Sequence, residues 1–93
     1  MSLLTRLIDP LDGEEKIPVH QFTAGLAEVF RGQITRSQFI AGFGIKPDEE
    51  AQLDSFISHL AGSTLTREEV HDVLLLAENG FRTPSQVLTR LGF

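Results

Sequence analysis

Apolar residues along the chain recur with the spacing of amphipathic helices, and no segment shows the apolar–polar alternation of a half-buried strand. The first such stretch covers residues 3–8 and stops before Pro10, which cannot continue a helix. A longer stretch runs from Pro18 to Arg31 and is followed by Gly32, the residue type that most often ends a helix. The predicted inner face of this helix carries Val19, Phe22, Leu26, Val29 and Phe30.

Three capping boxes mark the starts of further helices. In each box a threonine hydroxyl can accept from a backbone N–H three residues later, where a Gln or Glu side chain reaches back to the threonine N–H. The boxes are Thr35-Arg-Ser-Gln38, Thr66-Arg-Glu-Glu69 and Thr83-Pro-Ser-Gln86. Another helix is predicted from Pro47 to Gly62, because proline suits a first turn and the carboxylates at 48–50 suit the positive end of the helix dipole.

The patterns together predict an all-α fold, a small bundle of about five helices in one domain over residues 1–93. Residues 1–16 are expected to form a short N-terminal helix followed by a polar connector with turn chemistry at Asp12-Gly13. The helix that begins at Thr66 is more apolar than one stripe requires, because Leu75 and Leu76 widen its stripe beyond one face. We therefore expect it to be the central helix.

Two parts of the chain match each other at a constant offset of 48 residues. Residues 35–45 align with residues 83–93, and the threonine, serine, glutamine and glycine recur at equivalent places. Upstream, Phe22 matches Val70, Leu26 matches Leu74, and Gly32 matches Gly80. Either short capped helices have converged on one pattern, or residues 17–45 and 65–93 are pseudo-repeated helix–turn–helix units that share a core.

Composition narrows the class of protein. The 93 residues include no cysteine, which excludes a disulfide framework, a thiolate zinc site and a cysteine nucleophile. The net charge of -5 repels phosphate and argues against a nucleic-acid partner. The longest apolar run, Val73–Ala77, is far shorter than the roughly 20 residues that a bilayer requires, so no membrane insertion is expected. Residues 1–8 lack a cleavage site, and no signal peptide is expected either.

Candidate chemistry is sparse. Glu68 and His71 have the spacing of a di-iron carboxylate motif, but the second Glu-x-x-His that such sites need is absent. The carboxylates of residues 9–15 are wrongly spaced around Gly13 for an EF-hand calcium loop. No Gly-x-Ser-x-Gly motif supports a hydrolase. We therefore expect no catalytic residue, no cofactor and no metal site, and a protein that is not an enzyme.

A helix–turn–helix DNA-binding protein is the alternative function. Residues 38–46 and the helix after Pro47 have suitable lengths, with glycine in the turn. However, the recognition helix would begin with Asp48, Glu49 and Glu50, which face phosphates unfavourably. A basic patch assembled from Arg31, Arg36, Arg82 and Arg90 would favour this alternative.

The C-terminal half is the candidate interface, with partners that are other protein subunits or further copies of this chain. Its helix is more apolar than one stripe requires, and Phe81 and Phe93 each follow a terminating glycine. The candidate interface residues are Val70, Val73, Leu75, Leu76, Phe81 and Phe93. The competing interpretation is that the other helices cover this helix completely.

Four segments of the chain together carry a resemblance to known proteins. These segments are Ile17-Pro-Val-His20, Thr35-x-Ser-Gln38-x-Ile40, residues 71–78, and Leu91-Gly-Phe93. With them, the chain resembles the small acidic helical proteins encoded among the structural genes of tailed bacteriophages. The resemblance implies a tail, fibre or capsid-associated role, and a location in the virion or the host cytoplasm. It transfers no functional residues.

Overall fold

The structure is a computed structural model that describes residues 2–93. The predicted all-α class is confirmed: the described residues form six α-helices and no strand, one helix more than the approximate count expected. The helices are α1 (Ser2–Ile8), α2 (Val19–Phe30), α3 (Arg36–Phe43), α4 (Glu50–Ala61), α5 (Arg67–Glu78) and α6 (Pro84–Leu91). The helix expected from Pro47 begins as a single 3-10 turn, η1 (Pro47–Glu49), before α4.

The three capping boxes form as the sequence predicts. The hydroxyls of Thr35, Thr66 and Thr83 accept from the backbone N–H groups of residues 38, 69 and 86 at 3.1–3.2 Å. The side chains of those residues accept from the threonine N–H groups in return. Gly44 and Gly92 then end the two short helices in the left-handed conformation, with φ of 61° and 92°. Short helices are marginal alone, so these caps fix their ends and packing supplies the remaining stability.

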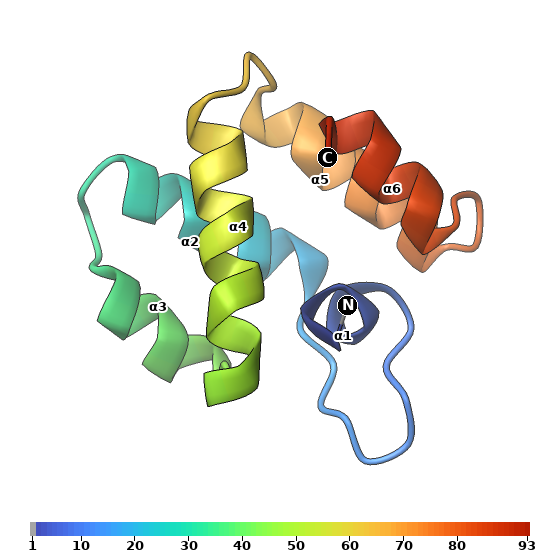
Figure 1. The fold of residues 1–93 in the computed structure, drawn as a ribbon, viewed down its shortest axis with the longest axis horizontal. Helices are drawn as coiled ribbons and strands as arrows, with labels where there is room; N and C mark the ends of the chain where they lie inside the picture. Colours follow the sequence, from blue (N-terminus) through green and yellow to red (C-terminus); the bar gives the residue numbers. More distant parts are fainter. Residues whose placement is uncertain (1) are drawn as a thin grey trace.

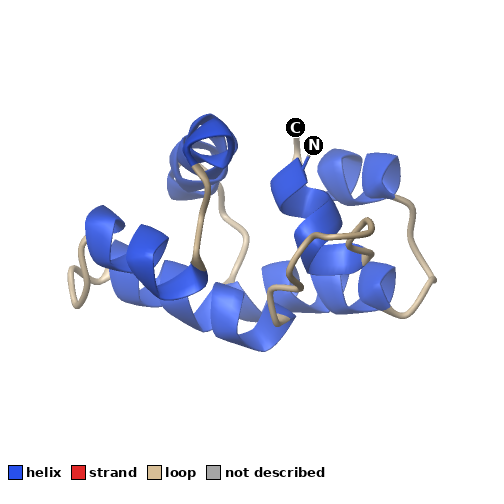
Figure 2. Cartoon of the chain, turned by 90° about the horizontal axis from the view of Figure 1, so that it is seen from below, coloured by secondary structure: helices blue, strands red, loops and turns tan. Residues whose placement is uncertain are grey.

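The helices pack in two layers around one core. α2 and α5 pack against each other and form one layer, on which α3 packs against α2 and α6 against α5 (Figure 1 and Figure 2). α4 crosses in front of α2 in Figure 1, and α1 lies against α5 and α6. The core centres on Phe22, whose ring meets the edges of Phe39, Phe43 and Phe56 at centroid distances of 5.5–6.3 Å.

A buried ion pair joins α1 to the turn before α4. The Arg6 guanidinium and the Glu49 carboxylate are 2.5 Å apart, and both side chains are almost fully buried. Arg6 also donates to the backbone carbonyl oxygens of Glu15 at 2.9 Å and Gly44 at 3.3 Å. The N-terminal helix is thereby fixed to segments roughly 10 and 40 residues away in the chain, which are brought together only by folding.

Residues 19–45 and 67–93 have the same secondary structure, residue for residue, at the offset of 48. α2 corresponds to α5 and α3 to α6 in both first and last residue. Gly32 and Gly80 both have positive φ, and the N–H groups of Ile45 and Phe93 close the two short helices on equivalent carbonyls. Each long helix with its short helix is therefore one hairpin, and the fold contains two such hairpins with α2 packed on α5.

Candidate functional site

The structure separates the six candidate interface residues into two groups. Leu75, Leu76, Phe81 and Phe93 keep 37%, 39%, 69% and 45% of their surface exposed. Val70 and Val73 are buried, so the expectation that they contribute to an interface surface is not met by this chain on its own. The reason is helical geometry: both lie on the side of α5 that carries Leu74 and Ala77 into the core. α5 is central, as expected, but one of its faces meets solvent.

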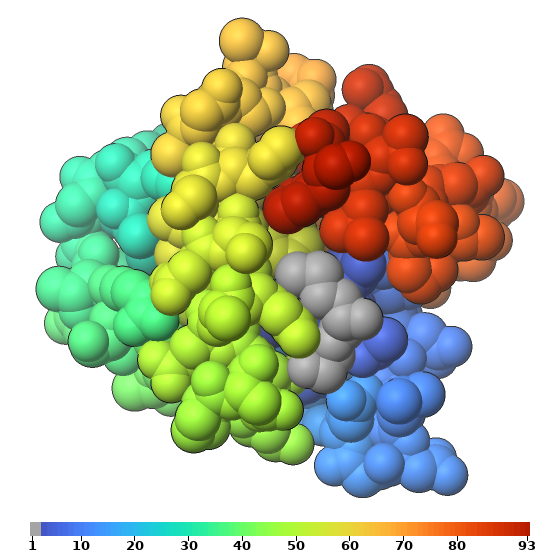
Figure 3. All heavy atoms as spheres, in the orientation of Figure 1, coloured from blue at the N-terminus to red at the C-terminus, as the bar shows by residue number. Residues whose placement is uncertain are grey.

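Phe93 is partly used within the chain. Its ring stacks on the His59 imidazole with centroids 4.2 Å apart and meets the edge of Phe56 at 5.3 Å. His59 Nε2 also lies 3.0 Å from the carbonyl oxygen of Leu91. In Figure 3 the C-terminal residues accordingly lie against α4. Phe93 therefore fastens α6 to α4, while Leu75, Leu76 and Phe81 remain as a set that we call the C-terminal apolar face.

The N-terminal hairpin provides an internal control for this face. Phe81 N–H donates to Leu76 O at 2.8 Å, the bond that closes a Schellman motif after α5. The equivalent bond after α2 runs from Gln33 N–H to Glu28 O at 2.9 Å. The same backbone geometry therefore forms with a polar pair in one hairpin and an apolar pair in the other. The fold does not require Leu76 and Phe81 to be apolar.

Charges flank the C-terminal apolar face on two sides. Glu68 and Asp72 are exposed on the turns of α5 that precede Leu75 on the outer side of the helix. Arg82, also exposed, directly follows Phe81 and has no ion pair among residues 2–93. The outer surface of the C-terminal hairpin thus runs from acidic through apolar to basic.

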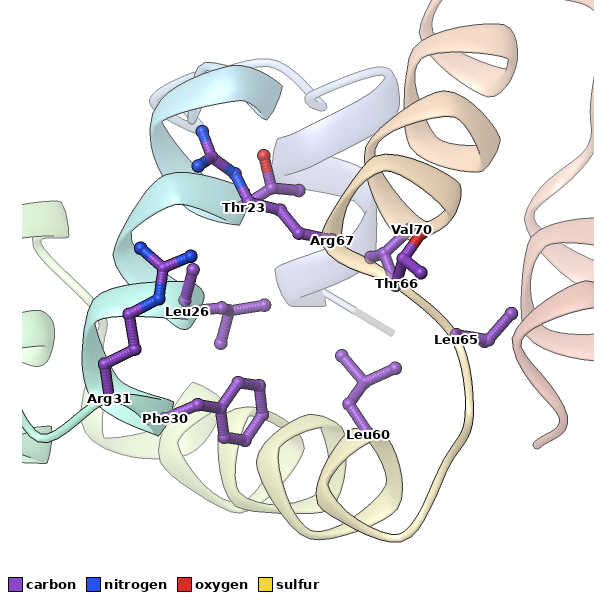
Figure 4. Close-up of a pocket in the computed structure, with 10 residues that line it drawn as sticks. Thr23, Leu26, Phe30, Arg31, Leu60, Leu65, Thr66, Arg67 and Val70 are labelled. Carbon is purple, nitrogen blue, oxygen red and sulfur yellow. The ribbon is translucent and has the colours of Figure 1, made fainter.

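A pocket lies on the other side of the molecule, between the end of α2, the end of α4 and the start of α5 (Figure 4). Its volume is about 220 Å³. Apolar side chains form most of the wall: Leu26, Ala27, Phe30, Leu60, Leu65 and Val70. Phe30, which the pattern places on the inner face of α2, is 46% exposed because it lines this opening.

Two arginines, Arg31 and Arg67, also line this pocket. Neither has an ion pair in the described part of the chain, whereas Arg6, Lys16 and Arg36 all have one. Unpaired cations beside an apolar pocket are notable in a chain of net charge -5. We call this feature the arginine-lined pocket. Sequence reasoning missed it, since its walls come from three separate segments.

The equivalent position in the C-terminal hairpin carries an ion pair instead of an aromatic ring. There Glu78 occupies the place that Phe30 has in α2, and its carboxylate pairs with Lys16 at 2.6 Å. Lys16 Nζ also donates to the carbonyl oxygens of Leu7 at 2.7 Å and Ile17 at 2.9 Å. One end of the α2–α5 pair therefore carries a lysine bridge, whereas the other end carries the arginine-lined pocket.

The basic patch that would favour DNA binding is not assembled. Arg36 lies within 2.6 Å of Asp54 and 3.3 Å of Glu50, and its hydrogen bond lowers the pKa of the Asp54 carboxyl. Arg82 and Arg90 line a shallow depression on α6, which lies across the molecule from α3 in Figure 1. Arg31, Arg36 and the pair of Arg82 and Arg90 thus lie in three separate places, and the charge of Arg36 is neutralised.

The described residues also present no metal-binding arrangement. No three His, Asp or Glu side chains within residues 2–93 are grouped so that they could hold a metal ion. His71 has Asp72 as its acidic neighbour, at 3.5 Å, and no metal-binding group forms around it. Across the same residues no helix is both long and apolar enough to cross a bilayer.

No protein-family model, curated protein or solved structure matches this chain.

The candidate functional features are therefore two surfaces of this chain itself: the C-terminal apolar face and the arginine-lined pocket. The first was partly predicted from the apolar excess of residues 70–77. The second became visible only when α2, α4 and α5 were placed together.

Proposed function

We propose that this chain is a non-enzymatic structural or accessory protein that acts through protein–protein contacts, as a tail, fibre or capsid-associated component of a bacteriophage virion. The observation that carries the contact role is the exposed apolar pair Leu76 and Phe81, at positions where the N-terminal hairpin is polar. The resemblance to small acidic helical phage proteins supports the virion role. An apolar surface that the fold does not need is the expected signature of an interface.

The partner that the C-terminal apolar face fits best is the same face of a second copy. The face lies between acidic residues at the start of α5 and Arg82 beyond its end. If two α5 helices pack antiparallel with Leu75 near the centre, Arg82 of each copy approaches the Asp72 end of the other. The apolar residues then cover one another, and a twofold axis makes the contact self-complementary.

The size of the face predicts a modest affinity. Complete burial of a leucine or phenylalanine side chain contributes about 1.5–3 kcal/mol. Leu75, Leu76 and Phe81 have roughly a third to two thirds of their surface left to bury. Six such side chains across a symmetric contact contribute several kcal/mol, against about 4–15 kcal/mol for the lost freedom of two molecules. We therefore expect weak association that depends on concentration, with a dissociation constant of about 0.1 mM or above.

Replacing Leu75 with Glu tests the proposal. The side chain is exposed, so the monomer should keep its helical circular dichroism spectrum, while the self-association seen by sedimentation velocity should disappear. Ala41→Glu is the matched control, because it places the same charge on an exposed site of α3. If Leu75→Glu leaves the association constant unchanged, the C-terminal apolar face is not the contact. If it unfolds the isolated domain, Leu75 is a core residue and the proposal fails.

The second candidate function is a small regulatory helix–turn–helix DNA-binding protein. It is favoured by one observation, the exposed pair formed by Arg82, in the loop before α6, and Arg90 on α6. Against it, α4 is preceded by Glu49, which is paired with Arg6, and begins with Glu50, which is paired with Arg36. Retention on immobilised DNA that falls with rising salt, and is lost in Arg82→Ala/Arg90→Ala, would favour this function over the structural one.

A further inference from the structure

The connector between α1 and α2 presents a leucine to solvent from an ordered turn. Leu11 is 65% exposed, although its backbone is fixed on both sides. Its N–H donates to the Glu14 carboxylate at 2.8 Å, and its carbonyl accepts from the Glu14 N–H at 2.9 Å. Thr5 Oγ1 donates to the same carboxylate at 3.2 Å and so attaches the turn to α1. Gly13, with φ of 84°, supplies the left-handed residue that the turn needs.

The leucine is flanked by acidic residues. Asp9 and Asp12 are exposed, and neither has an ion pair within residues 2–93. The turn therefore presents one apolar side chain between two unpaired carboxylates, in a conformation that its own hydrogen bonds hold in place. An interaction element that is ordered before binding loses little conformational entropy on binding. We call residues 9–14 the Leu11 turn.

The arginine-lined pocket has the complementary chemistry. Its walls are mostly apolar, and Arg31 and Arg67 supply two positive charges without ion-pair partners among residues 2–93. Its volume of about 220 Å³ is below the range of roughly 300–1,000 Å³ typical of small-molecule sites. A pocket of this size suits one apolar side chain of a protein partner, with a carboxylate beside it.

We propose that the Leu11 turn of one copy occupies the arginine-lined pocket of a second copy. Leu11 would insert between Leu26 and Leu60, and Asp9 and Asp12 would face Arg31 and Arg67. Each unpaired charge of one surface would then have a partner of opposite sign on the other, in a site partly shielded from water where such pairs are worth most.

This contact joins two different surfaces, so it is heterologous. Within one molecule the two surfaces lie on opposite sides: the connector is at the lower right of Figure 1, and the ends of α2 and α4 are at the upper left. A chain therefore cannot fill its own pocket. Repeating the contact produces a ring or an open filament. It goes beyond the proposed contact through the C-terminal apolar face, which uses other residues and does not depend on it.

Arg67→Glu is the most informative single change. Arg67 is the first residue of α5, where a carboxylate interacts favourably with the helix dipole, so the variant should fold at least as well as the parent protein. Asp12→Arg is its partner variant on an exposed turn position. We expect each variant alone to weaken head-to-tail self-association at least tenfold, about 1.4 kcal/mol, in sedimentation velocity. Arg90→Glu, an equal charge change on α6, is the control and should have no such effect.

Mixing the two variants is the decisive measurement. In an equimolar mixture of Asp12→Arg and Arg67→Glu, the arginine introduced in one variant meets the glutamate introduced in the other. At the following contact in the assembly, Asp12 of the Arg67→Glu variant meets Arg67 of the Asp12→Arg variant, as in the parent protein. Association should therefore return. The experiment is done in a Leu75→Glu background, so that loss of the C-terminal apolar face and loss of this contact are measured separately. Leu11→Ser, which removes the anchor without changing charge, should weaken association as Arg67→Glu does.

Three results would overturn the inference. The first is a protein that remains monomeric at millimolar concentration in the Leu75→Glu background, which would assign the pocket to a partner other than a second copy. The second is unchanged association in Arg67→Glu or Leu11→Ser. The third is a mixture of the charge variants that associates no better than either variant alone.

Discussion

Gly25 lies on α2 where the Phe39 and Phe43 rings of α3 pack against it, and replacing it with alanine should destabilise the domain. A Cβ at this position would lie 2.8 Å from the Phe39 ring and 2.9 Å from the Phe43 ring, closer than carbon atoms pack. The Phe39 ring cannot easily retreat, because it is buried and already lies 4.7 Å from the Phe43 ring and 5.5 Å from the Phe22 ring. The added methyl group therefore requires α2 and α3 to separate or the rings to leave their rotamers.

Two opposing contributions determine how much stability the Gly25→Ala variant loses. Alanine is favoured over glycine in a helix interior by about 1 kcal/mol. Overpacking a well-filled core costs about 1–3 kcal/mol. Because two aromatic rings are affected and one is fully enclosed, we place the cost at the upper end, for a net loss of about 1–2 kcal/mol. In a domain of this size each kcal/mol lowers Tm by about 4–8 °C.

Thermal and urea unfolding of Gly25→Ala, followed by circular dichroism, would measure this loss. Gly42→Ala is the matched control: it adds the same methyl group within helix α3, where no atom beyond its chain neighbours and the helix's own backbone lies within 4 Å. The control should therefore gain stability by about 1 kcal/mol. A rise in Tm for Gly25→Ala equal to that of Gly42→Ala would refute the packing argument.

Two further predictions concern the core and the absence of chemistry. Glu49→Ala leaves the buried Arg6 guanidinium without its carboxylate. The free energy of unfolding measured in urea should therefore fall by about 3–5 kcal/mol. A loss below about 1 kcal/mol would show that the Arg6 guanidinium is solvated in another way. Because no metal-binding group exists among residues 2–93, a chelator should leave the helical circular dichroism signal unchanged, and a fall in that signal would contradict the metal-free interpretation.

Helix positions were predictable from the sequence because their signals are local. Capping boxes, glycine stops and 3.6-residue periodicity involve residues within one or two turns, and the capped helices begin where the threonines predict. Phe30 shows the limit of this reasoning. Its spacing matches the inner face of α2, but whether an inner position is covered depends on what packs there, and near Phe30 the ends of α4 and α5 leave a pocket.

The correspondence at an offset of 48 residues also separates what the sequence determines from what the tertiary structure decides. The sequence alone determines two hairpins with equivalent helices, because each hairpin is specified by its own caps and apolar stripe. Only the tertiary structure decides how equivalent positions differ. Gly25 accommodates Phe39 and Phe43 in one hairpin, while Val73 accompanies Val87 and Leu91 in the other, so side-chain volume is balanced across each pair of helices.

The exposure of the candidate surfaces was likewise decided by the tertiary structure. Leu75 and Leu76 were identifiable as excess apolar residues, but their exposure depends on which sides of α5 are occupied by α1, α2 and α6. The arginine-lined pocket and the Arg6–Glu49 pair join residues far apart in the chain. Local sequence carries the information for backbone hydrogen bonds within a helix, whereas burial and charge pairing depend on distances between helices, and those exist only once the chain has folded.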